Sequence, residues 1–149
     1  MASTGISHIR TIRSKLSVRS MSSIVRKYDI DAKFHPRPPG PGDAIANAPK
    51  DFVGVYRVFF KSGLRLPALD FLETILDYYG LHIAQITPNG FRKILCFLLL
   101  CIALDIVPSI TIFRHFYLPM SNGDWVSFFL CHGLVELYDS LPTSIKYWK

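Results

Sequence analysis

The sequence predicts an α+β fold, with a core of three helices and a small antiparallel sheet built from early and late strands. Segment 94–104 contains no charged or strongly polar side chain, so either the rest of the protein or a bilayer must cover it. Apolar side chains recur at helical spacing in 67–79 and 110–117, on either side of that segment. Valine and aromatic residues, which favour strands, are concentrated in 51–60 and again after residue 124.

The composition indicates one domain preceded by a basic arm. Half of the 149 residues are hydrophobic, which argues against global disorder. Residues 1–28 contain no acid and account for the whole net charge of +6. Their basic residues are Arg10, Arg13, Lys15, Arg19, Arg26 and Lys27. The other 11 basic residues balance the 11 acidic ones, so the folded part lacks the basic excess of a typical nucleic-acid-binding domain.

The arm, residues 1–28, is predicted to be disordered. Ile6, Ile9, Ile12 and Leu16 recur at near-helical spacing, which also suits a short amphipathic helix. Three hypotheses stay open for it: a solvated terminus, an organelle transit peptide, and a tail that makes weak contacts with nucleic-acid phosphates.

Residues 29–50 are predicted to form a linker, because 34–49 is rich in proline and glycine. The domain then begins with 51–60, which we interpret as a buried strand. Its apolar residues also fit a helical stripe, so a helix stays open as the alternative; they are Phe52, Val55, Tyr56, Phe59 and Phe60. Gly63 is expected to supply a positive φ at the exit of this segment.

The first core helix is predicted over 67–79. Pro67 suits its first position, and Asp70 and Glu73 lie where the helix dipole favours acids. Gly80 is expected to end the helix in a left-handed cap, with Leu81 folding back.

The second core helix is predicted over 88–104, buried by the rest of the protein. Thr87 is a good N-cap, and Asp105 to Pro108 is expected to stop the helix. The alternative is a single membrane span. It is disfavoured because a span needs about 20 apolar residues, and a window of that length here includes Asp105 and Pro108.

The end of the chain is predicted to form a third helix and two late strands. Ser109 can cap a helix over 110–117 that closes at Pro119. A turn is expected at 121–124, followed by strands at 125–131 and 133–138.

We find no motif that carries an enzymatic reaction, and predict no catalytic residues, cofactor, metal site or small-molecule substrate. Cys96 and Cys101 are five apart on a helix, so they point about 140° apart and cannot share a metal. Cys131 with His132 lacks the second ligand pair of a zinc site. An odd number of cysteines, two of them in the apolar helix, predicts free thiols in a reducing compartment such as the nucleus or cytoplasm.

One residue pair suggests a phosphate contact. Arg92 and Lys93 lie in the first turn of the second core helix, where free N–H groups attract anions. The simpler interpretation is that Arg92 pairs with Glu73 or Asp77 of the preceding helix.

Several segments in order resemble the plant gypsy-type transposon domain, which is found in retroelement-derived proteins. They are GLRLPALDFLETIL, ITPNGFRKILCF, VPSITIFRHFYL and SIKYWK. The matching motif residues, which the resemblance makes structural, are Gly63, Leu64, Arg65, Leu66, Pro67, Gln85, Pro88, Asn89, Arg92, Pro108, Ser109, Trp148 and Lys149. The likeness runs from about residue 22 to 149, and the domain itself is expected over 51–149.

The resemblance implies a non-enzymatic domain with a gag-like role in self-association or nucleoprotein packing. The family normally continues into a further strand past Trp148 and Lys149, so this copy is expected to be truncated and to leave a sheet edge unpaired. Two alternatives stay open: an inert transposon relic, and an organelle-targeted or single-span membrane protein.

Overall fold

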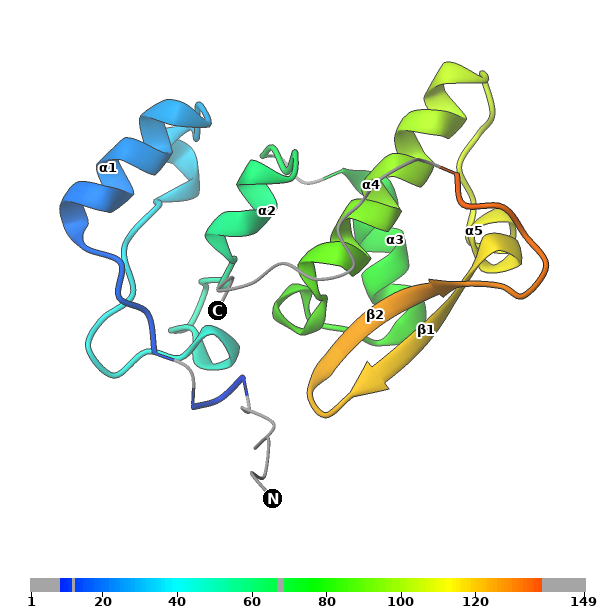
Figure 1. The fold of residues 1–149 in the computed structure, drawn as a ribbon. Coiled ribbons are helices and arrows are strands. Elements are labelled where there is room, and N and C mark those ends of the chain that lie inside the picture. The colour runs from blue at the N-terminus through cyan, green and yellow to red at the C-terminus, as the bar shows by residue number, and fades with distance from the viewer. Residues whose placement is uncertain (1–8, 12, 67–68, 138–149) are drawn as a thin grey trace.

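The structure is a computed structural model that describes residues 9–11, 13–66 and 69–137 (Figure 1). It confirms the predicted α+β class, with a core of helices and an antiparallel hairpin. The elements are α1 Val18–Lys27, α2 Arg57–Lys61, α3 Asp70–Tyr79, α4 Pro88–Ala103, α5 Ile110–Phe116, β1 Tyr117–Asn122 and β2 Trp125–Leu130. Single 3₁₀ turns occur at Ala32–Phe34, Ile45–Asn47 and Ile83–Gln85.

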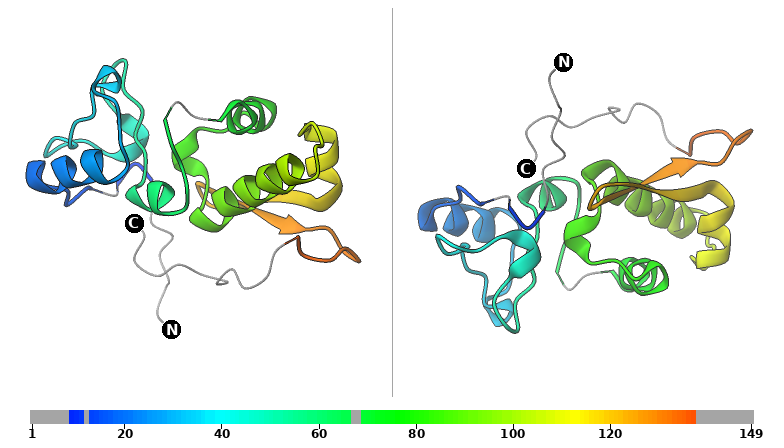
Figure 2. Two further views of the ribbon diagram at one scale, coloured as in Figure 1. Left: turned by 90° about the horizontal axis from the view of Figure 1, so that it is seen from above. Right: turned by 90° about the horizontal axis from the view of Figure 1, so that it is seen from below.

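The three predicted core helices, α3, α4 and α5, meet through a cluster of phenylalanines. Phe97 of α4 lies 5.4 Å from Phe71 of α3 and 5.2 Å from Phe113 of α5, measured between ring centroids. Phe113 also contacts Phe128 of β2 at 5.1 Å. Three of these four rings are almost wholly inaccessible to solvent, so each contributes about 2–3 kcal/mol of burial. Helix α4 thus lies between α3 and the hairpin, as Figure 2 shows.

The helix ends follow the local signals in the sequence. The Thr87 side chain accepts the Gly90 N–H at 3.0 Å and caps α4. Gly80, at φ 62°, ends α3, and the Leu81 N–H returns to the Leu76 carbonyl at 2.8 Å. Helix α3 begins at Asp70, because Leu69 is extended; Pro67, its predicted first residue, lies outside the described residues.

Asp105 ends α4 as predicted, by a backbone turn that usually requires glycine. Its φ is 54°, in the left-handed region. Its N–H reaches the Ile102 carbonyl at 3.2 Å, and the Ile106 N–H reaches the Cys101 carbonyl at 2.8 Å. These two bonds form a Schellman cap, which satisfies carbonyl groups at the helix end.

The buried strand predicted over 51–60 is wrong. Residues 52–56 form neither strand nor helix, and residues 57–60 are helical, in α2, as the alternative interpretation allowed. Phe59 of α2 stacks on Phe91 of α4 with ring centroids 4.7 Å apart. Burial of this ring against a helix decides the conformation, which local strand propensity could not reveal. Gly63 follows at φ 112°, so its predicted positive φ is confirmed.

The sheet therefore consists of a late hairpin instead of early and late strands paired together. Strand β1 pairs with β2 in the register Tyr117 with Leu130 to Asn122 with Trp125. The predicted turn is confirmed, and Gly123 within it has a φ of 62°. A strand over 117–122 was not predicted, because Pro119 was interpreted as a stop signal.

The second late strand, predicted over 133–138, is wrong within the described residues. Residues 133–137 form no strand, and Gly133 turns the chain at φ 82°. The other edge of β2 is instead occupied by the chain before α4. Ile86 forms a parallel bridge with Val126, and the Thr87 N–H reaches the Val126 carbonyl at 2.9 Å.

Helix α1 lies within residues 1–28, where disorder was expected. Ser17 caps it, and Ile24 is buried. The following Tyr28 lies 5.6 Å from Phe60 of α2, so this segment joins the core. The predicted amphipathic helix does not form over the described part of 9–16, and Ile6 and Ile12 lie outside the described residues. The division into arm, linker and domain stays a prediction.

Candidate interaction surface

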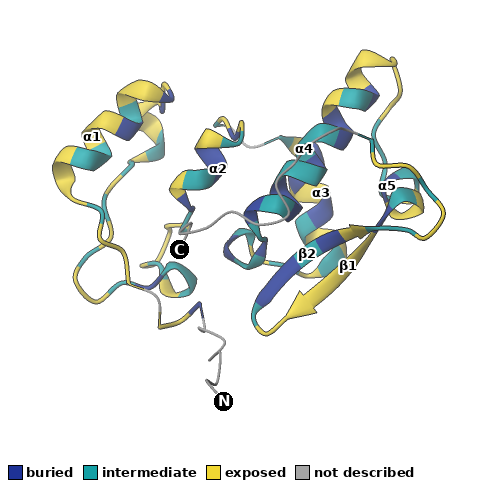
Figure 3. Ribbon diagram, viewed as in Figure 1, coloured by how far each residue is buried: buried dark blue, intermediate teal, exposed yellow. Residues whose placement is uncertain are grey.

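The C-terminal end of α4 is the largest concentration of exposed apolar side chains in the described structure. We define the α4 tip as five residues, each between 42% and 83% exposed: Leu99, Ile102, Leu104, Ile106 and Val107. Figure 3 shows this end of α4 and the loop after it mainly as exposed. The prediction that the whole of 88–104 is covered is therefore wrong for its last turn. Within the described residues, no helix is both long enough and apolar enough to cross a membrane.

The tip is exposed because α4 outreaches its neighbours. Helix α4 has 16 residues, whereas α3 has 10 and α5 has seven. Phe97, Leu98 and Cys101 still face the core, and Cys101 is the last buried residue of α4. Beyond that point no charge interrupts the apolar surface except Asp105, the only charged residue between Lys93 and Arg114. Contiguous apolar surface of this kind marks interaction sites.

The first group of family-motif residues ties α2 to its neighbours. Leu64 is buried, and Gly63 provides the turn that precedes it. Arg65 donates to the Phe60 carbonyl at 3.3 Å and to the Leu64 carbonyl at 2.8 Å. Its guanidinium lies 5.5 Å from the ring centroid of Tyr28, next to α1. These contacts close the end of α2 and leave Arg65 little freedom to act elsewhere.

The second group of motif residues caps helices. Gln85 accepts the His82 N–H at 2.9 Å, in a capping box. Pro88 is buried at the first position of α4, and Asn89 beside it is half-buried. Ser109, after Pro108, accepts the Ile112 N–H at 3.3 Å and caps α5. Leu66 is half-buried, whereas Pro67, Trp148 and Lys149 lie outside the described residues.

The side chains of Arg92 and Lys93 contact different parts of the structure. Arg92 Nε donates to Ser62 Oγ at 3.1 Å, on the α2 side of α4. In the described part of the chain Arg92 forms no ion pair with Glu73 or Asp77, so that predicted pair is absent too. The start of α4 packs closely on β2, because a Cβ on Gly90 would lie 3.3 Å from the Ser127 Cα, and the phosphate contact stays a prediction.

Lys93 belongs instead to a small network on the hairpin. Its ammonium lies 5.5 Å from the ring centroid of Tyr117 and 5.7 Å from that of Phe129. It is also 3.9 Å from Glu136 Oε2, while Glu136 Oε1 accepts a hydrogen bond from the Tyr117 hydroxyl at 3.1 Å. Sequence reasoning missed this network, because its members are far apart along the chain and no local spacing marks them.

The cysteines do not form a reactive or metal-binding group. Burial raises the pKa of the Cys96 and Cys101 thiols, which disfavours the nucleophilic thiolate. All three cysteines are free, and Cys131 is half-buried. Among residues 9–11, 13–66 and 69–137, no three histidine, cysteine or acidic side chains gather closely enough to hold a metal ion.

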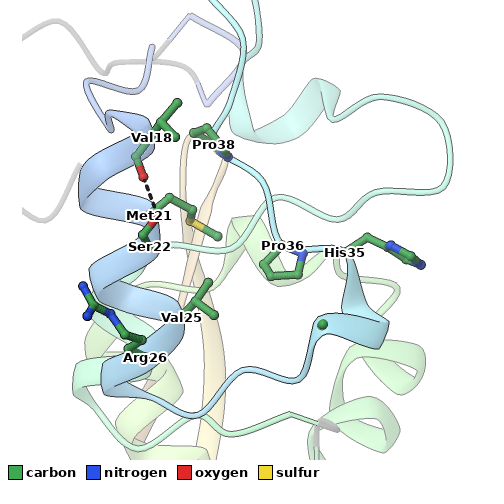
Figure 4. Close-up of a pocket in the computed structure, with 9 residues that line it drawn as sticks. Val18, Met21, Ser22, Val25, Arg26, His35, Pro36 and Pro38 are labelled. Atoms are coloured by element: carbon green, nitrogen blue, oxygen red, sulfur yellow. Dashed lines mark hydrogen bonds between the residues drawn. The ribbon is translucent and has the colours of Figure 1, made fainter.

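A second surface feature is an open groove between α1 and the proline-rich segment, of about 650 Å³ (Figure 4). Val18, Met21 and Val25 give α1's side of the groove an apolar character. The remaining lining residues are Ser22, Arg26, Ala32, His35, Pro36 and Pro38. We call this the α1 groove.

Together these features define a small α+β domain whose predicted motif residues, where described, serve packing and helix capping. Residues 53–120 match the family described as "Putative gypsy type transposon", so the resemblance predicted from the sequence is confirmed over this segment. It extends from the loop before α2 to Met120 in β1. No curated protein and no solved structure matches the chain. The plant origin, the gag-like character and the weak nucleic-acid contact of the arm stay predictions.

Proposed function

We propose that this chain is a non-enzymatic, retroelement-derived domain that acts by self-association through the α4 tip. The observation that carries the proposal is the exposure of five large aliphatic side chains within nine residues of sequence. Covering one such side chain contributes about 1.5–3 kcal/mol. Any partner that covers the tip and removes it from water is therefore bound with a favourable free energy.

A second copy of the chain fits this surface. A two-fold axis brings the same patch of each copy together, so the patch must be self-complementary. The α4 tip meets that requirement, because aliphatic side chains attract one another and only Asp105 carries a charge there. Ile102 stands at its centre, between Leu99 in the preceding helical turn and Ile106 in the cap.

The absence of a catalytic role is part of the same proposal. Its support is that the predicted motif residues are already engaged in structure. Arg65, Gln85 and Ser109 each form the hydrogen bonds that close a helix end. An enzyme that used these groups would have to give up those bonds.

Sedimentation velocity over a range of concentrations tests the proposal. The wild-type chain is expected to associate at about 1 M salt, where charges are screened within about 3 Å. Ile102→Glu places a charge in the contact and is expected to give a monomer. The matched control is Val135→Glu, because Val135 is 84% exposed and lies outside the tip, and this variant is expected to associate like wild type. Undiminished association of a folded Ile102→Glu chain would refute the proposal.

A further inference from the structure

We propose that a second contact joins copies of this chain head to tail: the basic face of α1 in one copy binds the acidic face of α3 in the next. This inference rests on the proposed self-association but uses a different surface and a different force. It names the partner of the α1 groove, which neither the fold nor the α4 tip explains.

The basic face of α1 consists of Arg19 and Arg26 with Ser22 and Ser23 between them. Ser22 and Arg26 also line the groove, whereas Arg19 and Ser23 do not, and all four are exposed. The two arginines are seven residues apart, which is two helical turns and about 10.5 Å along the axis. The small serines let another helix approach. Within the described residues neither arginine forms an ion pair.

The acidic face of α3 has the same spacing. Asp70 and Asp77 are also seven residues apart, with Glu73 and Thr74 between them, and all four are exposed. Helix α3 contains no basic residue, and its three acids form no ion pair with described residues. Laid side by side, the two faces place opposite charges together at both ends of the contact.

One apolar residue beside each charged face adds to the proposed contact. Val18 is exposed and lines the α1 groove, as Figure 4 shows. On α3, the ring of Tyr78 is half exposed next to Asp77. Its hydroxyl accepts a hydrogen bond from Arg114 at 2.6 Å, so the ring stays on its own chain and offers only its exposed side to the contact.

The two faces cannot meet within one chain. Helix α1 lies at one end of the molecule, while α3 lies on the side of α4 opposite the hairpin (Figures 1 and 2). Two different patches that bind each other make a heterologous contact, which repeats from copy to copy. Such a contact builds chains of molecules, whereas the two-fold contact at the α4 tip builds pairs.

Charge reversal in the Ile102→Glu background isolates this contact from the α4 tip. At an ionic strength of about 0.1 M or below, that chain is expected to keep a weak association that is lost at about 1 M. Arg19→Glu with Arg26→Glu is expected to abolish it, and so is Asp70→Lys with Asp77→Lys. A chain with all four changes is expected to associate again. An equimolar mixture of the two double variants is also expected to associate, with the two variants alternating, because both kinds of contact then pair opposite charges.

Asp70→Asn with Asp77→Asn is the second α3 variant, because lysine at the start of α3 opposes the helix dipole. The inference is overturned if the folded Arg19, Arg26 variant associates undiminished, or if the folded four-fold variant stays monomeric. It is also overturned if nuclease treatment removes the association and Arg19→Glu with Arg26→Glu abolishes binding to a single-stranded RNA oligomer. That result would make α1 a nucleic-acid surface. The α4 tip proposal is tested separately, by the sedimentation of the wild-type and Ile102→Glu chains at high salt.

Discussion

Gly63 and Gly80 both adopt a positive φ, but they differ in how well a residue with a side chain would be tolerated at each position. Gly80, at 62°, lies in the left-handed region that other residues enter at moderate cost, and nothing crowds its missing Cβ. Gly63, at 112°, lies outside that region, and a Cβ there would meet the Leu95 Cδ2 at 2.5 Å. Leu95 can move its methyl group, so the backbone conformation is the larger obstacle.

We therefore expect Gly80→Ala to lower the free energy of unfolding by about 1 kcal/mol and Gly63→Ala by about 2 kcal/mol or more. Urea denaturation monitored by tryptophan fluorescence measures both values. An equal loss in the two variants would show that the difference in φ between the sites has no energetic weight.

At the scale of single elements, helix α5 depends on its cap. It has only seven residues, too few to be stable alone, and Ser109 satisfies one of its free N–H groups. Ser109→Ala is expected to cost about 1 kcal/mol in the free energy of unfolding.

Thr111→Ala is the matched control for that measurement, since Thr111 is exposed in the first turn of the same helix. It removes a hydroxyl without touching the cap and replaces a β-branched residue with a better helix former. Chemical denaturation should leave it at or above the wild-type stability. A loss as large as that of Ser109→Ala would contradict the role of the cap.

The elements that could be predicted from sequence are those whose limits are local. Thr87, Ser109, Gly80 and Asp105 act on their own helix ends, so α3, α4 and α5 could be placed within a few residues. The conformation of 51–60 depends instead on the stacking of Phe59 on Phe91, a contact 32 residues away along the chain. No local pattern records that contact.

Strand β1 was missed for a related reason. The Cys131 N–H bonds the Phe116 carbonyl at 2.7 Å, so the pair of these two residues is hydrogen-bonded. Because such pairs alternate with non-hydrogen-bonded ones, Pro119 opposite Phe128 falls in a non-hydrogen-bonded pair. Its nitrogen faces away from β2, where a proline costs no ladder bond. The stop signal was therefore compatible with a strand.

For the whole molecule, Tyr56 connects pH to stability. Its ring lies 5.7 Å from Phe59 and 5.9 Å from Trp125, between the start of α2 and β2. Burial raises the pKa of Tyr56 well above its ordinary value of 10.0. The unfolded chain therefore loses this proton before the folded chain does. Stability from the neutral phenol is fully present below about pH 10 and is lost as the pH rises beyond it.

The free energy of unfolding should accordingly fall above about pH 10, by up to about 1.4 kcal/mol per pH unit for this group. Tyr56→Phe is expected to make the fall shallower. Denaturation midpoints at several pH values on either side of 10 measure the effect. Identical slopes in the two chains would mean that other groups dominate.

The sequence could predict an apolar central helix but not the candidate site on it. The uncharged run of 94–104 is visible in the sequence, whereas its exposure depends on how far α3 and α5 extend beside it. The two charged faces are likewise local patterns, on α1 and α3, whose separation on the molecule only the fold defines.

In the last turn of α4 only Cys101 is buried, so the exposed residues there contribute little to the stability of the fold. Substitutions can make the α4 tip more hydrophobic or more polar without unfolding the protein. Related chains can therefore gain or lose self-association while keeping the same fold. The residue types at positions Leu99, Ile102 and Val107 are expected to determine which of the two applies to a given copy.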